Sequence, residues 1–210
     1  MGFYLKSGMM KHAEIKFGKN WNKNVTYGTK NYEFEIVNVL IRKRSHVREL
    51  AKTIGTNHAT TLRKINSLYK KNVLDYKTEG KNDVYFIKKT LEAKSYIFMT
   101  ERYKVLLIIG KYPSLRKIFE NLQKDKRIKL AILFGSYAKE SADKKSDIDV
   151  FVEGKNKQLK KDIEMIDTKL SVKIGKFDVA NPLIKEIEKN YVIIKGVETF
   201  YERRNFFAEN

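Results

Sequence analysis

Two aspartates, Asp147 and Asp149, are separated by one residue in segment 146–152. In this segment Ile148, Val150 and Val152 alternate with Asp147, Asp149 and Phe151. This alternation is typical of a β-strand, in which residues two apart share a face, so both carboxylates are expected on one face about 7 Å apart at their backbones. Two like charges at this spacing repel each other unless a cation lies between them. All-oxygen ligation favours Mg²⁺ or Mn²⁺, so the pair predicts a divalent metal site.

A short apolar run over residues 130–134 stops at Gly135 and Ser136, which predicts a buried strand that ends in a tight turn. Glycine lets the backbone approach an anion, and the amides and hydroxyl around Ser136 can hold phosphate oxygens. A phosphate-binding turn beside a paired-carboxylate strand suits phosphoryl or nucleotidyl transfer. An Asp-rich turn followed by an edge strand with a solvated polar face is the alternative, and it would leave the Gly-Ser turn unexplained.

The spacing of these residues resembles a known signature. Gly135-Ser136, ten intervening residues and then Asp147-x-Asp149 resemble the minimal nucleotidyltransferases of the DNA-polymerase-beta-type superfamily, and residues 133–139 are similar to that family as well. The resemblance covers about residues 112–202. It implies an α/β sheet domain with a third carboxylate on the strand after the Asp-x-Asp strand, where this chain has Asp178.

The resemblance also implies roles for these residues in a metal-dependent enzyme. A nucleoside triphosphate, with ATP the expected donor, would lose pyrophosphate as its nucleoside monophosphate moves to an unidentified acceptor. The catalytic and metal-binding residues implied are Asp147, Asp149 and Asp178, with Mg²⁺ or Mn²⁺, and the nucleotide-binding residues are Gly135, Ser136 and Lys139. An outward-facing Asp178 beside a lysine is the alternative. The chain departs from the family at Glu140, where glycine is usual, and an inward-pointing carboxylate there would repel a triphosphate.

A second set of elements is expected over residues 32–90. Apolar residues recur at helical spacing over 32–41, 47–54 and 59–68, with Gly55 at a sharp turn. Residues 73–78 and 84–87 flank a turn at Gly80 and predict a hairpin. A helix-turn-helix followed by a hairpin resembles the winged-helix transcription regulators, whose second helix enters the major groove. The apolar face of this second helix is expected at Ala59, Leu62, Ile65 and Leu68.

If this region binds double-stranded DNA, the exposed positions of the second helix would contact bases and lysines would contact phosphates. The base-contacting candidates are Asn57, His58, Thr60, Thr61, Arg63 and Lys64. The phosphate-contacting candidates are Lys70, Lys71, Lys77 and Lys81. The alternatives are a solvated helical face or a module for protein contact.

The formal net charge is +19 over 210 residues. Residues 1–90 carry nineteen Lys and Arg against seven Asp and Glu, and residues 91–210 carry twenty-five against eighteen, so the excess is 12 in the first segment and 7 in the second. This excess suggests a nucleic-acid partner, and a generally lysine-coated surface is the alternative. The absence of cysteine, of a signal-peptide pattern and of a long apolar run predicts a cytoplasmic protein without a membrane span.

The expected fold class is α+β with two domains, a winged helix-turn-helix followed by a nucleotidyltransferase-type sheet domain, a fusion of archaeal-like kind. The expected parts are an N-terminal arm at 1–30, the winged helix at 31–90, a connector helix at 91–111 and the sheet domain at 112–210. The connector helix is apolar on so much of its surface that burial between domains or in a homodimer is expected. Three functions stay open: a nucleotidyltransferase, a transcription regulator that uses the transferase fold as a nucleotide sensor, and an antitoxin-like protein that adenylylates a partner protein.

Overall fold

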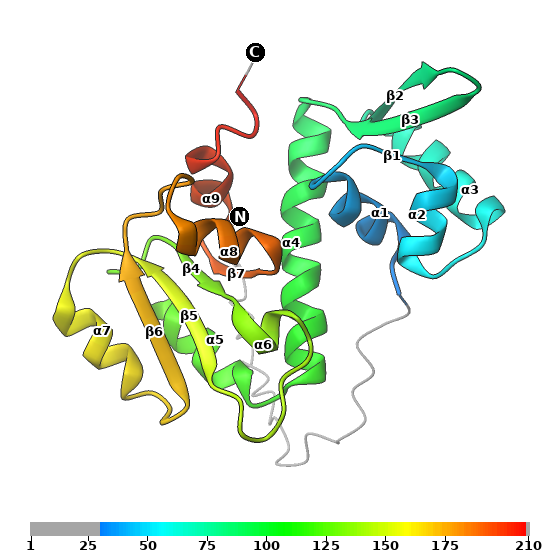
Figure 1. The fold of residues 1–210 in the computed structure, drawn as a ribbon. Helices are drawn as coiled ribbons and strands as arrows, with labels where there is room; N and C mark the ends of the chain where they lie inside the picture. The colour runs from blue at the N-terminus through cyan, green and yellow to red at the C-terminus, as the bar shows by residue number, and fades with distance from the viewer. Residues whose placement is uncertain (1–29, 209–210) are drawn as a thin grey trace, which may run out of the picture.

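Three helices and a three-stranded sheet form the first part of the computed structural model, which describes residues 30–208 (Figure 1). Its elements are α1 (Tyr32–Leu40), β1 (Ser45–His46), α2 (Val47–Ile54), α3 (His58–Lys70), β2 (Leu74–Glu79) and β3 (Asn82–Ile87). Gly55 ends α2 with a φ of 67°, and the Asn57 side chain accepts a hydrogen bond from the Thr60 amide at 2.8 Å to begin α3. β3 pairs antiparallel with both β1 and β2. The predicted winged helix-turn-helix is confirmed.

The expected N-terminal arm at residues 1–30 falls almost wholly on residues 1–29, which lie outside the described residues, as do residues 209–210. Within residues 30–208, no helix is long and apolar enough to cross a membrane.

Helix α4 (Leu91–Lys111) runs between the two parts of the molecule (Figure 1). Thr90 caps its first turn by accepting a hydrogen bond from the Ala93 amide at 3.2 Å. This helix is less broadly buried than expected, because the side chains of Met99 and Leu106 are 43% and 48% exposed. Ile97, on another side of α4, is fully buried.

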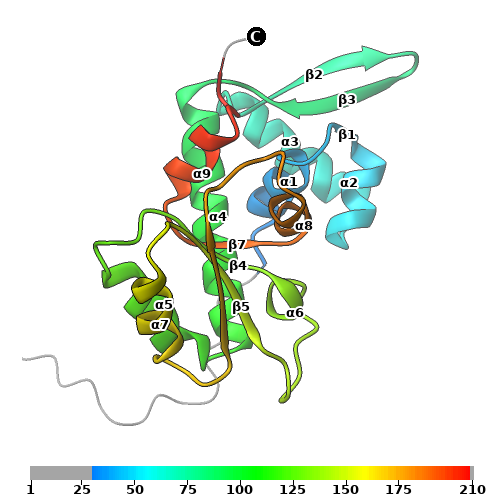
Figure 2. The same ribbon diagram turned by 60° about the vertical axis from the view of Figure 1, so that its left-hand side comes forward.

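The sheet domain contains α5 (Leu115–Lys124), β4 (Ala131–Leu133), α6 (Gly135–Ala138), β5 (Ile148–Glu153), α7 (Lys157–Glu164), β6 (Leu170–Gly175), α8 (Pro182–Lys189), β7 (Val192–Lys195) and α9 (Val197–Arg203). Its four strands lie in the order β6-β5-β4-β7. β4 is antiparallel to β5 and β7, whereas β5 and β6 are parallel. Figure 2 shows α5 and α7 on one side of this sheet and α8 on the other.

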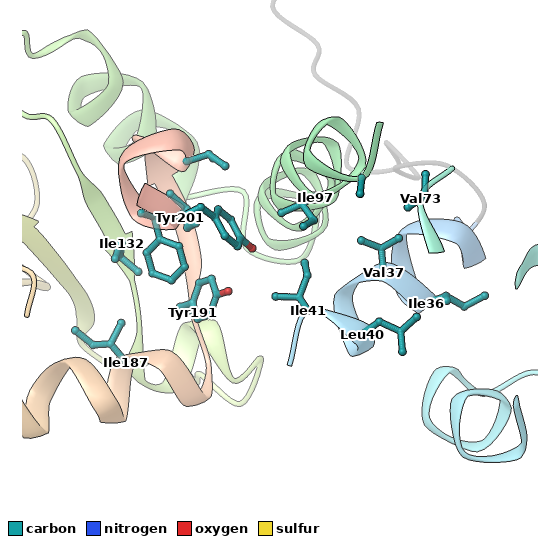
Figure 3. Close-up of a cluster of buried hydrophobic side chains, with 14 of the residues drawn as sticks. Ile36, Val37, Leu40, Ile41, Val73, Ile97, Ile132, Ile187, Tyr191 and Tyr201 are labelled. Atoms are coloured by element: carbon teal, nitrogen blue, oxygen red, sulfur yellow. The ribbon is translucent and has the colours of Figure 1, made fainter. Parts of the chain in front are cut away.

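Each face of the sheet has its own apolar core. One core joins α5 and α7 to the sheet through residues such as Leu122, Leu159 and Val150. The other core continues from the sheet through α4 into the winged helix, so that Ile36, Ile97, Ile132 and Tyr201 belong to one cluster (Figure 3). The two parts of the chain are therefore packed together, as the lack of a flexible linker predicts.

Two elements of the sheet domain are shorter than their apolar patterns predict. The pattern predicts a strand over 171–180, but β6 ends at Gly175, because the Asp178 side chain accepts a hydrogen bond from the Ala180 amide at 2.9 Å and forms a turn that leads to α8. The pattern also predicts a helix over 159–169, but α7 ends at Glu164, because Asp167 forms a similar turn with the amide of Lys169 at 2.9 Å.

Candidate functional site

The Gly135 turn lies directly against the Asp149 side chain. A Cβ atom added at Gly135 would stand 2.3 Å from Asp149 Oδ2, and Gly135 has a φ of 70°, which L residues with side chains rarely adopt. Glycine is therefore required here for two independent reasons. The turn continues into α6, a single helical turn in which Ser136 is half-buried. The predicted adjacency of the Gly-Ser turn and the Asp-x-Asp strand is present in the structure.

The two aspartates lie at the start of β5. Asp147 directly precedes the strand and is exposed, and Asp149 is the second residue of the strand and is half-buried. Burial raises the pKa of Asp149, and the negative charge of Asp147 raises it further, while the positive charge of Lys173 and a hydrogen bond from Ser171 act in the opposite direction. The carboxylates therefore repel each other, as the sequence predicts.

Asp178 does not join this pair. In the parallel pairing of β5 with β6, Asp149 lies opposite Ser171 and Glu153 lies opposite Gly175. Gly175 is thus about 13 Å along the strand from the level of Asp149. Asp178 follows three residues later and is exposed in a turn, and the ring of its neighbour Phe177 lies 6.1 Å from the Phe151 ring. Figure 1 shows α6 near the start of β5 and the chain leaving β6 at the opposite end of the sheet. Among residues 30–208 the expected three-carboxylate cluster is not assembled, and a metal-binding role for Asp178 stays a prediction.

The residues at the start of β5 fit a smaller metal site than the resemblance implies. Within residues 30–208, no group of three His, Cys, Asp or Glu side chains is placed to hold a metal ion. Asp147 and Asp149 could supply two carboxylate ligands to one divalent cation. The β6 neighbours of Asp149 are a hydroxyl at Ser171 and a cation at Lys173, so β6 supplies no third carboxylate beside Asp149.

Lys139, the remaining nucleotide-binding candidate, directly follows α6. Lys139 is exposed, and its Nζ lies 3.7 Å from Glu186 Oε1. Glu140 follows with a φ of 58°, which explains the preference for glycine at this position. Lys111 Nζ donates to the Glu140 backbone carbonyl at 2.8 Å and lies 3.1 Å from its carboxylate. The Glu140 carboxylate is therefore held by α4 and neutralised.

On the winged helix, most DNA-binding candidates reach solvent. His58 and Arg63 are exposed on α3, and Thr60 and Lys64 are half-exposed. Asn57 is exposed but is engaged as the helix cap. On the hairpin, Lys77 and Lys81 are exposed.

Thr61 is not an exposed position of α3, contrary to expectation. Its side chain is fully buried, and its hydroxyl donates to the Asn57 carbonyl at 2.9 Å. The buried face of α3 consists of Thr61, Ile65 and Leu68, whereas Ala59 is exposed and Leu62 half-exposed. The face is therefore rotated from the expected one, because a threonine whose hydroxyl bonds to the preceding turn can be buried.

Sequence reasoning missed a polar cluster between the two domains. Glu101 on α4 is fully buried, and its carboxylate accepts a hydrogen bond from the Tyr201 hydroxyl at 2.7 Å and one from Lys104 Nζ at 2.8 Å. Ser171 and Lys173 were also missed as neighbours of Asp149. The signal for Glu101 was an acidic residue in the middle of an apolar helix, whereas the register of β5 with β6 left no signal in the sequence.

Comparison with known proteins addresses the sheet domain directly. Residues 116–205 match the family described as Polymerase beta, Nucleotidyltransferase. The C-terminal domain is a nucleotidyltransferase domain of the polymerase beta type. No curated protein matches the chain.

Several solved structures are similar to part of the chain. A homodimeric winged helix-turn-helix DNA-binding domain from Mycobacterium bovis is 17% identical, with 37% of this chain and 68% of that chain covered and a TM-score of 0.30. Sso10a-2, a DNA-binding protein from Sulfolobus solfataricus, is 22% identical, with 47% and 99% covered and a TM-score of 0.34. The PcaV transcriptional regulator from Streptomyces coelicolor is 18% identical, with 51% and 72% covered and a TM-score of 0.34. The fold of the N-terminal domain rests on the order and pairing of its own elements.

Proposed function

We propose that this protein is a DNA-binding regulator whose nucleotidyltransferase domain serves as a nucleotide sensor. A nucleoside triphosphate, with ATP the first candidate, would place its phosphates on the Gly135-Ser136 turn. Asp147 and Asp149 would hold the accompanying Mg²⁺ or Mn²⁺, which neutralises phosphate charge. The observation that carries this proposal is the contact between Gly135 and Asp149, which joins the phosphate turn to the carboxylate pair.

Two features support sensing over catalysis. Asp178 lies in the turn after β6 and forms no three-ligand group with the carboxylate pair among residues 30–208, and the strand position opposite Asp149 holds Ser171. A two-carboxylate site can hold one cation with a nucleotide, whereas two-metal transfer requires ligands for ions on both the attacking and the leaving oxygens.

Double-stranded DNA is the proposed partner of the winged helix. α3 presents His58 and Arg63 to solvent, and the hairpin presents Lys77 and Lys81. Arginine can bond to both acceptors of guanine in the major groove, and lysines contact phosphates. The excess of basic residues in the first 90 positions supports the same partner.

Calorimetric titration with Mn²⁺ and a non-hydrolysable ATP analogue tests the sensor. The wild-type protein is expected to bind, and Asp149→Asn is expected to lose about tenfold or more in affinity, because a charged ligand of the cation is removed. Asp143→Asn is the matched control, since Asp143 is an exposed aspartate engaged within its own loop by Lys145 and Ser146. Equal binding by wild type and Asp149→Asn would reject the assigned site.

DNA binding is tested on duplexes selected from a random pool by the wild-type protein. Arg63→Ala is expected to weaken binding by about 1–3 kcal/mol, because one base-contacting side chain is lost. Lys124→Ala removes an exposed positive charge on α5 and serves as the control. An unchanged affinity for Arg63→Ala would remove Arg63 from the base-contacting set.

Nucleotidyl transfer is the second candidate function, and the shared face of Asp147 and Asp149 favours it. An acceptor hydroxyl would attack the α-phosphorus of the nucleotide, a new phosphoester bond would form, and pyrophosphate would leave. Labelled ATP incubated with Mg²⁺ or Mn²⁺ and candidate acceptors, including proteins, provides the assay. Transfer by the wild type that is lost in Asp147→Asn/Asp149→Asn would establish this activity, and equal pyrophosphate release by both would reject it.

A further inference from the structure

A pocket lies between the winged helix and the nucleotidyltransferase domain. It encloses about 560 Å³, a volume typical of small-molecule sites. Its walls come from α1 and the two residues Arg42 and Lys43 beyond it, from α2, from α4, from the end of α6 and from the segment that leads into β7. Both domains therefore contribute to one cavity.

Basic residues outnumber acidic residues in the wall of this pocket, which contains Arg42, Lys43, Lys104 and Lys139 against Glu35 and Glu140. Three of these cations are paired with carboxylates outside the pocket wall: Lys43 with Glu49, Lys104 with Glu101 and Lys139 with Glu186. The acidic pair is engaged, since Glu35 accepts a hydrogen bond from the Tyr103 hydroxyl at 3.3 Å and Glu140 is paired with Lys111.

Arg42 and Lys104 lie close to one tyrosine ring. Lys104 Nζ is 3.9 Å and the Arg42 guanidinium carbon is 5.9 Å from the centre of the Tyr191 ring. Burial lowers the pKa of Lys104, Glu101 opposes that change, and the repulsion of Arg42 adds to it. The Arg42 guanidinium donates to the carbonyl of Lys189 at 2.7 Å, and within residues 30–208 it has no carboxylate at ion-pair distance. An anion placed between the two cations would relieve their repulsion.

The pocket wall includes residues that directly follow the phosphate turn. Lys139 and Ala138 form part of its wall, and both follow Ser136 within one helical turn. Residues three apart on a helix are about 5–6 Å apart at their Cβ atoms. The side chains of Ser136 and Lys139 can thus contact successive phosphates of one polyphosphate chain.

We infer that the terminal phosphates of the nucleotide enter this pocket and bind Arg42 of the winged-helix side together with Lys104 and Lys139. This inference rests on the proposed nucleotide site at Gly135-Ser136. A ligand that touches both domains favours the domain arrangement in which the contacts form, so it couples nucleotide binding to DNA binding. The ligand class is a nucleoside triphosphate, as opposed to a monophosphate.

The test compares ATP, AMP and inorganic tripolyphosphate on the full chain, with calorimetric titration in the presence of Mn²⁺. Arg42→Gln is expected to weaken binding of ATP and of tripolyphosphate by about tenfold or more, because a charge-assisted hydrogen bond is lost, and to leave AMP binding unchanged. Arg42→Lys is expected to restore part of the loss. Arg44→Gln is the matched control, since it removes the same charge two residues away, where the guanidinium stacks on Phe86 at 5.0 Å outside the pocket.

A second readout measures coupling. The ratio of DNA affinities with and without ATP is expected to differ from one by about fivefold or more in the wild type, and to return to one in Arg42→Gln. Asn190→Asp provides an independent variant, because it places a negative charge in the pocket wall while leaving the Arg42 side chain in place. It is expected to weaken ATP and tripolyphosphate binding as well.

The outcomes separate the two proposals. If the wild type binds no nucleotide, the sensor proposal fails and this inference fails with it. If the wild type binds ATP, and both Arg42→Gln and Asn190→Asp bind ATP and tripolyphosphate as tightly as the wild type does, the inference alone is overturned.

Discussion

At the scale of single residues, Gly135 is the most constrained position of the site. Gly135→Ala is expected to destabilise the protein by about 2–4 kcal/mol, because it adds the cost of a left-handed alanine to a clash with Asp149. Gly80→Ala is the matched control, since Gly80 has a φ of 62° with open space around it, and it should cost about 1–2 kcal/mol. Chemical denaturation measures both, and equal losses would show that the close contact has no energetic weight.

The raised pKa of Asp149 predicts a pH-dependent stability of opposite sign to that of most aspartates. A carboxyl whose pKa is higher in the folded state favours folding below its ordinary pKa, and this contribution is lost as pH rises through the raised value. Asp149→Asn should therefore raise the denaturation midpoint at pH 7, and the difference from the wild type should shrink as pH falls from the raised pKa of Asp149 to the ordinary aspartate pKa.

Asp143 gives the comparison for this prediction. Hydrogen bonds from the Lys145 amide and the Ser146 hydroxyl lower its pKa, so its contribution is present at pH 7 and is lost as pH falls. Asp143→Asn should lower the midpoint at pH 7. The same sign of change in both variants would contradict the assigned environments.

At the scale of elements, α4 contains a buried charge pair whose removal should be costly. Glu101→Ala leaves Lys104 without its carboxylate partner and removes the acceptor of the Tyr201 hydroxyl. A loss of about 3–5 kcal/mol in the free energy of unfolding is expected. Glu92→Ala on the same helix, where the carboxylate is exposed and bonded to Asn72, should cost within about 0.5 kcal/mol. Similar losses for both would show that Glu101 is not a structural anchor.

The sequence predicted elements better than it predicted their relative placement. Periodicity located α1 to α4 and the hairpin, because each of these elements carries its own apolar pattern and its own cap or turn residue. The position of Asp178 could not be predicted, because it depends on where β6 ends and on which residue of β6 lies opposite Asp149. The spacing of the motif predicted that the Gly135 turn and Asp149 lie next to each other. The cavity between the domains could not be predicted, because its walls come from separate segments and no single segment carries a pattern for it.

At the scale of the whole molecule, the shared core predicts cooperative unfolding. One apolar cluster includes Ile36 of the winged helix, Ile97 of α4 and Ile132 of the sheet, so the two domains should unfold in a single calorimetric transition. Ile97→Ala should lower the free energy of unfolding by about 2–5 kcal/mol and speed hydrogen exchange in both domains. Met99→Ala, at an exposed position two residues away on the same helix, is the control. Two separate transitions in the wild type would contradict this view.

Glu140 affects how a movement of α4 is transmitted to the turn at Gly135. Glycine at this position would relax the left-handed backbone, yet it would also release the carboxylate that ties the segment to Lys111. With glutamate, Lys111 at the end of α4 holds this segment through both the Glu140 carboxylate and the Glu140 carbonyl. We therefore expect a movement of the end of α4 to reach the turn that begins at Gly135 through these two contacts.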